Sequence, residues 1–68
     1  MNSISESESL VLISISEFIK ENNYSPSVRD IAYDLDKSVS TVHFHLKNLK
    51  EKGFIDYKEK VSRTIRIK

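Results

Sequence analysis

The sequence predicts a mainly α-helical domain, with three helices followed by a small β-hairpin. Apolar residues recur at three- and four-residue steps as far as Leu49, serine precedes each helical segment, and the pattern changes to alternation after Gly53. With 68 residues, one glycine and one proline, the chain can form one small domain at most, spanning residues 1–68. We expect residues 1–5 to be flexible.

The first helix begins at a serine-based cap. Ser5 and Glu8 have the spacing of a capping box, in which each side chain bonds the backbone N–H of the other. An apolar stripe at helical spacing follows, formed by Val11, Leu12, Ile15, Phe18 and Ile19. The pair Asn22-Asn23 ends this helix, because asparagine tolerates the left-handed conformation that closes helices.

The second helix follows the extended segment Tyr24-Ser25-Pro26. Ser27 caps it, Asp30 occupies the capping-box position, and the inward residues are Ile31, Ala32 and Leu35. It is only about two turns long, and Asp36-Lys37 ends it.

Ser38 caps the third helix, whose inward residues are Val42, Leu46 and Leu49. Gly53 ends it. The hairpin then has its turn at residues 59–62, with Thr64 and Arg66 on the outer face of the second strand. We expect its inner face to pack on the helices through Ile55, Tyr57, Ile65 and Ile67.

The overall charge of +1 conceals a strong asymmetry. Residues 1–36 carry two basic and seven acidic side chains, a net −5, whereas residues 37–68 carry nine basic and three acidic ones, a net +6. Such a positive half suits a polyanion, although a solvated surface with segregated signs would look the same. The chain has no cysteine, signal-like start or apolar run near the length of a membrane span, so we expect a cytoplasmic protein.

The triplet His43-Phe44-His45 resembles a metal clip only at first sight. On a helix, residues two apart point in nearly opposite directions, so the two imidazoles cannot hold one ion. The serines are explained as helix caps, and the single glycine, Gly53, excludes a glycine-rich phosphate loop. We therefore expect no enzyme activity, metal, cofactor or small-molecule substrate.

The outward face of the third helix carries a large apolar side chain, Phe44, which is unfavourable unless that face meets a partner. Ser40 and Lys47 share this face, Thr41 and Asn48 flank it on one side, and His43 flanks it on the other. Hydroxyl, amide and imidazole groups can bond base edges in a major groove, and phenylalanine can contact a thymine methyl group. The alternative is that Phe44 packs under the hairpin or against a protein.

The segment YSPSVRDIAYDLDKSVSTVHFHLKNLKEKGFID resembles the N-terminal winged helix-turn-helix domain of LexA-type repressors, and the similarity extends from about Leu10 to Ile67. SRTI at residues 62–65 resembles that family's final strand. Three positions depart from the family pattern: Asp36 replaces a usual glycine, Lys37 a usual apolar residue, and Phe44 a commonly polar or basic one. The turn also looks one residue shorter. Since the chain ends at Lys68, we expect the peptidase and dimerisation domain of those repressors to be absent.

The resemblance implies a sequence-specific double-stranded DNA-binding regulator, which we expect to be a nucleoid-associated repressor. A monomer would contact one half-site, so strong specificity would require a homodimer on a palindromic operator or cooperative binding. The alternative is a winged-helix module that binds another regulator or a replication protein. The expected DNA contacts are Ser27, Arg29, Ser38, Ser40, Thr41, His43, Phe44, Lys47, Asn48, Lys58, Lys60 and Arg63.

Overall fold

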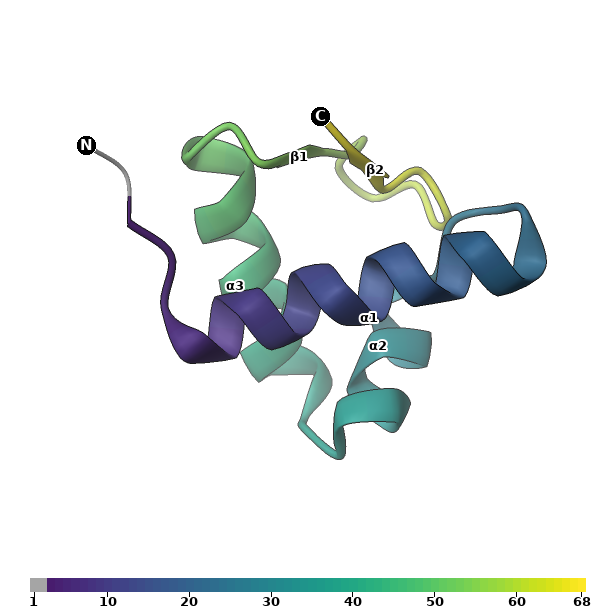
Figure 1. Ribbon diagram of the computed structural model, residues 1–68, viewed down its shortest axis with the longest axis horizontal. Helices are drawn as coiled ribbons and strands as arrows, with labels where there is room; N and C mark the ends of the chain where they lie inside the picture. The colour runs from purple at the N-terminus through teal and green to yellow at the C-terminus, as the bar shows by residue number, and fades with distance from the viewer. Residues whose placement is uncertain (1–2) are drawn as a thin grey trace.

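The computed structural model describes residues 3–68, which form three helices and a two-stranded antiparallel sheet (Figure 1). The elements are α1 (Glu6–Asn22), α2 (Val28–Leu35), α3 (Val39–Glu51), β1 (Ile55–Asp56) and β2 (Arg66–Ile67). The helices contact one another in all three pairs, while β1 contacts α3 and β2 contacts α1. This arrangement confirms the predicted fold class, a winged helix-turn-helix.

Each helix begins where its serine predicts. Ser5 and Ser27 form complete capping boxes with Glu8 and Asp30, and their hydroxyls each accept a backbone N–H at 3.1 Å. The Ser38 hydroxyl accepts the N–H of Thr41 at the same distance. These local bonds satisfy donors that a helix start leaves unpaired, so the sequence defines where each helix begins.

Left-handed residues end the first two helices and follow the third. Asn23 and Asp36 have φ values of 63° and 54°, and Gly53 has a φ of 85°. Asp36, at the position of a usual glycine, keeps the left-handed conformation, and the N–H of the next residue, Lys37, closes the helix end by donating to the Ala32 carbonyl at 2.9 Å.

The core lies where the three helices and the hairpin meet. Its buried members are Val11, Ile15, Ile31, Ala32, Val42, Leu46, Leu49, Ile55 and Ile65. Leu12, Ile19 and Leu35 pack against them, as the apolar stripes predict. Phe18 instead lies at the edge of the core, where its ring is edge-on to that of Tyr24 and the two ring centroids are 5.5 Å apart.

The hairpin differs from the prediction, because each strand has only two residues. Ile55 pairs with Ile67 and Asp56 with Arg66, so residues 57–65 form a long connection that we call the wing loop. Side-chain hydroxyls end the ladder, since the Ile65 N–H donates to Ser25 Oγ and the Lys58 N–H to Thr64 Oγ1, both at 2.9 Å.

The predicted inner face of the hairpin was partly wrong. Ile55 and Ile65 are buried and Tyr57 packs against the core, but Ile67 is 45% exposed. Ile67 lies at the end of the two-residue strand β2, where its side chain stays largely open to solvent.

At the amino-terminal end, the predicted flexibility of residues 1–5 is untested. Residues 1–2 lie outside the described part of the chain, whereas the Ser3 carbonyl accepts a 2.8 Å bond from Lys52 Nζ and Ser5 caps α1. No helix within residues 3–68 combines the length and apolar character required to span a membrane.

Candidate nucleic-acid interface

The solvent face of α3 is fixed by the burial of its opposite side. Val42, Leu46 and Leu49 are at most 1% exposed, so the helix has a single rotation relative to the core. Phe44 is consequently 61% exposed. The predicted contacts Ser40, Thr41, His43 and Lys47 are also exposed, and Asn48 is half-buried.

Two polar side chains at the start of α3 already bond each other. Ser38 Oγ accepts the Thr41 N–H at 3.1 Å and donates to Thr41 Oγ1 at 2.8 Å. Ser38 therefore orients the Thr41 hydroxyl, which keeps its own proton for an acceptor outside the protein. Both side chains are exposed.

The two histidines of α3 lie in different environments, as the helical period predicts. His43 is exposed, whereas His45 is half-buried and its Nδ1 has no hydrogen-bond partner among the described residues. Within residues 3–68, no group of three histidine, cysteine or acidic side chains could hold a metal ion.

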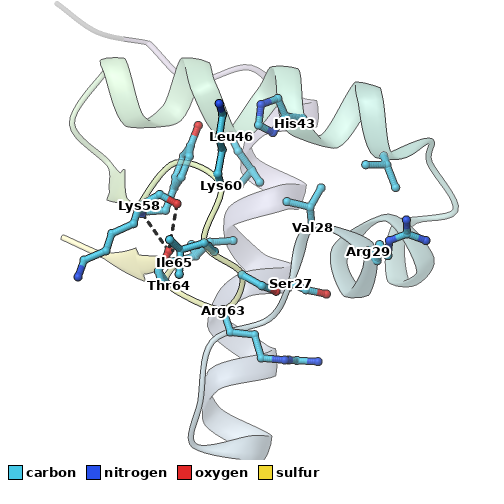
Figure 2. A pocket seen from close by; sticks show the side chains of 14 residues that line it. Ser27, Val28, Arg29, His43, Leu46, Lys58, Lys60, Arg63, Thr64 and Ile65 are labelled. Atoms are coloured by element: carbon cyan, nitrogen blue, oxygen red, sulfur yellow. Dashed lines mark hydrogen bonds between the residues drawn. The ribbon is translucent and has the colours of Figure 1, made fainter.

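A groove of about 330 Å³ separates α3 from the wing loop and reaches the first turn of α2 (Figure 2). Its floor includes apolar side chains such as Leu46, Val28 and Ile65. The predicted contacts that line it are Ser27, Arg29, His43, Lys58, Lys60 and Arg63. The groove thus brings together predicted DNA contacts from the start of α2, from α3 and from the wing loop.

Two of these residues belong to the amino-terminal turn of α2. Ser27 is half-buried, and its hydroxyl already caps α2. An anion at this helix start would therefore be bound by the backbone N–H groups that follow Ser27. Arg29 is exposed two residues later. A helix start with an adjacent guanidinium group is suited to an anion such as phosphate.

The wing loop is folded back by Thr64. The Thr64 hydroxyl accepts the Lys58 N–H and lies 3.1 Å from the Val61 carbonyl, to which it can donate. Lys60, at the turn, has a φ of 62°. Figure 2 shows Lys60 extending toward the helix that carries His43, whereas Lys58 points away from the groove.

Arg63 has a different environment from the two wing lysines. Its Nη1 donates to Asp30 Oδ2 at 2.9 Å and to the Ser25 carbonyl at 3.2 Å. Its guanidinium carbon also lies 5.1 Å from the Tyr24 ring centroid. The predicted contact of Arg63 with the DNA backbone stays a prediction.

The basic residues divide into paired and unpaired sets. Lys50, Lys52, Arg63 and Arg66 each lie within 4 Å of a carboxylate oxygen. Within the described chain, no such pair involves Arg29, Lys47, Lys58 or Lys60, all of which are exposed. With the exception of Arg63, the cations predicted to contact DNA therefore have no carboxylate partner among the described residues.

The comparisons with known proteins agree with this geometry. The family described as the LexA DNA binding domain matches residues 1–64. The chain belongs to the LexA DNA-binding domain family. Similar proteins include the LexA repressor of Desulfatibacillum aliphaticivorans, 45% identical over 56 residues that cover 81% of this chain and 28% of that protein. The LexA repressor of Thermotoga maritima is 39% identical over 67 residues, or 98% of this chain and 34% of that protein.

This LexA-type domain spans about a third of the length of the curated relatives it matches, as with the LexA repressor of Thermosipho africanus (strain TCF52B), which is 37% identical over 96% of this chain and 33% of its own length. The family relationship confirms the resemblance inferred from residues 24–56 and from the final strand. It concerns the DNA-binding domain alone.

Sequence reasoning missed several contacts that hold together the elements of the candidate interface in this LexA-type domain. Asp30 holds Arg63, and Ser25 Oγ holds the Ile65 N–H. Lys50 Nζ donates to the Tyr57 carbonyl at 2.7 Å, which ties the start of the wing loop to α3. These partners are 7 to 40 residues apart along the chain, and no local spacing rule indicates such pairs.

Two side chains in this region have shifted pKa values. The backbone N–H of Ser27 holds the pKa of Asp30 below its ordinary value, with a further contribution from Arg63. Burial, followed by the nearby Glu59 and Glu51 carboxylates, raises the pKa of Tyr57. Asp30 is therefore ionised at neutral pH and available to the Arg63 guanidinium group.

Proposed function

We propose that this LexA-type domain binds double-stranded DNA sequence-specifically and acts as a transcriptional repressor. The observation that carries the proposal is the exposed polar face of α3, with Phe44 at its centre, next to the unpaired lysines of the wing loop. A helix of this composition suits a major groove, where side chains contact base edges. The names of the similar LexA repressors support regulation by repression.

In the proposed complex, α3 enters the major groove through Ser40, Thr41, His43, Phe44, Lys47 and Asn48. Ser38 orients Thr41 at the point of entry. The amino-terminal turn of α2, with Ser27 and Arg29, binds one phosphate, while Lys58 and Lys60 follow the sugar-phosphate backbone. These phosphate contacts fix the register of α3, and the base contacts supply the specificity.

One domain of this size contacts one half-site. A homodimer on a palindromic operator is therefore part of the proposal, with half-sites separated by about one helical turn, roughly 34–36 Å, or a multiple of it. The second domain supplies the specificity that a single α3 helix lacks.

The experiment that tests DNA binding is fluorescence polarisation with a random-sequence duplex over a series of salt concentrations. We expect binding at low salt that weakens linearly in a log–log plot, because phosphate neutralisation releases counterions. Selection from a random DNA pool then yields the operator. Absence of salt-dependent binding would defeat the DNA proposal.

The second candidate function is a protein-interaction module, which the 61% exposure of Phe44 also favours. The acidic side of the molecule adds to this alternative, since Glu17, Glu21, Asp30 and Asp34 line a second groove between α1 and α2. A partner that binds α3 would protect Phe44 without any dependence on duplex DNA. Competition between duplex and candidate protein for the same α3 face separates the two functions.

A further inference from the structure

Arg63 joins the wing loop to the segment that begins α2. Its Nη1 donates to the Asp30 carboxylate on the first turn of α2 and to the Ser25 carbonyl before it. The guanidinium carbon lies 5.1 Å from the Tyr24 ring centroid and 6.0 Å from that of Phe18 on α1. One side chain therefore contacts α1, α2 and their connection.

The backbone at Arg63 is in a conformation that needs external support. Its φ of 58° lies in the left-handed region, which disfavours side chains other than glycine by about 1–2 kcal/mol. Lys60, in the same loop, has a φ of 62°. Such backbone conformations persist where surrounding contacts hold them in place, and at Arg63 those contacts are the bonds to Asp30 and Ser25.

A second bond ties the same part of the loop to the same segment. The Ile65 N–H donates to Ser25 Oγ at 2.9 Å, two residues after Arg63. Both ties therefore end on residues 25–30, directly beside the phosphate site proposed at Ser27 and Arg29. They fix the distance across the groove between this site and Lys60 on the opposite side (Figure 2).

The orientation of Arg63 also argues against a direct role on DNA. Figure 2 shows its guanidinium group directed away from the side of the groove that carries Lys60 and His43. Its charge is offset by the Asp30 carboxylate at 2.9 Å, which weakens its attraction for a phosphate. Arg63 differs in this respect from Lys58 and Lys60.

We propose that Arg63 is a positioning residue, which holds the wing loop against the first turn of α2 before DNA arrives. This inference rests on the proposed DNA-binding function. Because the loop is ordered in advance, Lys58 and Lys60 lose less conformational freedom on binding, and the affinity for any duplex rises. Asp30 and Ser25 are the residues through which Arg63 acts.

The first test measures the order of the loop in the absence of DNA. We expect Arg63→Ala to lower the ¹⁵N order parameters of residues 57–65 from about 0.85 to below about 0.6, with the helices unchanged. A loop that stays rigid in this variant overturns the proposal. This measurement does not depend on DNA binding, so failure of the wild-type protein to bind DNA defeats only the proposed function.

The second test compares Arg63→Ala with Asp30→Asn and the double variant in binding to random duplex. Asparagine keeps an oxygen acceptor for the Ser27 N–H, so the α2 cap is retained. Glu21→Gln removes the same charge from the same acidic groove without a contact to Arg63 and serves as the matched control. We expect Asp30→Asn to bind about threefold to tenfold more weakly than Glu21→Gln, and the double variant to bind no more weakly than Arg63→Ala.

The opposite result identifies Arg63 as a phosphate ligand. In that case Asp30→Asn removes the charge that offsets the guanidinium group, and the variant binds at least as tightly as Glu21→Gln, which overturns the positioning role. Arg63→Lys provides the decision if Arg63→Ala does not fold. A positioning arginine is not fully replaced by lysine, which lacks the planar guanidinium group that lies beside the Tyr24 ring, whereas a phosphate ligand retains most of its affinity and salt dependence.

Discussion

The carboxylate of Glu8 lies 2.7 Å from the ammonium group of Lys52, and this contact joins the start of α1 to the end of α3. Glu8 is only 4% exposed, and its Oε1 also accepts the Ser5 N–H at 3.0 Å. Lys52 in turn donates to the Ser3 carbonyl. A single buried carboxylate therefore completes a helix cap and ties together two helices that are distant in sequence.

Glu8→Gln should lower the free energy of unfolding by about 1.5–3 kcal/mol, the range for hydrogen bonds to charged groups. Glutamine keeps an acceptor for Ser5 but loses the charge that attracts Lys52. Urea unfolding measures the change, and Glu6→Gln, in the same turn but exposed, is the control, with an expected loss of a few tenths of a kcal/mol. Equal losses in the two variants would contradict the importance of the Lys52 contact.

The same contact predicts a dependence of stability on pH. The Lys52 ammonium group, followed by the Ser5 N–H, holds the pKa of Glu8 below its ordinary value of 4.5. Because the folded-state pKa is depressed, this stabilisation is fully present above about pH 4.5 and is lost as the pH falls through the folded-state pKa. Urea midpoints measured from about pH 6 to about pH 2 should therefore fall less steeply in Glu8→Gln than in the wild type. Parallel curves would contradict the shift.

Gly53 provides a test of backbone conformation alone. Its φ is 85°, and a Cβ built there meets no atom within 4 Å. Gly53→Ala should therefore cost about 1–2 kcal/mol through the left-handed backbone and not through a clash. Thermal unfolding should show a fall of at least about 4 °C, and a smaller one for Gly53→Asn, because asparagine tolerates this region better. An alanine variant as stable as the wild type would contradict the assigned φ.

The helices could be predicted closely because their signals are local. Ser5, Ser27 and Ser38 each bond a backbone N–H three residues later, and the left-handed Asn23 and Asp36 end α1 and α2. The period of the apolar residues also fixed which face of α3 is exposed. These features depend on neighbours within one helical turn, so the sequence contains them in full.

The wing could be predicted only in outline, because tertiary contacts decide its shape. Thr64 and Ser25 take backbone donors that an ideal hairpin would use in its ladder, which shortens both strands. The ion pair of Arg63 with Asp30 spans 33 residues and that of Lys52 with Glu8 spans 44. Its charge and its place at the tip of the predicted hairpin suggested Arg63 as a DNA contact, while the direction of its side chain depends on partners that no spacing rule identifies.

Phe44→Ala should leave stability nearly unchanged, within about 0.5 kcal/mol, since the side chain is 61% exposed. In the proposed complex it should relax specificity at one or two base pairs, each worth about 1–3 kcal/mol of discrimination. Selection from a random DNA pool measures this effect. Tyr33→Ala is the control, because Tyr33 is 91% exposed on α2 and should alter neither property. A fall of several degrees in Tm for Phe44→Ala would instead assign Phe44 to the core.

Lys60→Ala should weaken binding to all duplexes by a similar factor, because a phosphate contact carries no sequence information. The slope of log affinity against log salt should become shallower by about 0.9, the value for one released counterion. Lysine and alanine both lack the conformational freedom of glycine, so the substitution does not relieve the backbone strain at a φ of 62°. Lys20→Ala, which removes an exposed lysine from α1, should leave the slope unchanged. A loss confined to particular sequences would assign Lys60 to base recognition, because only contacts to base edges discriminate between duplexes.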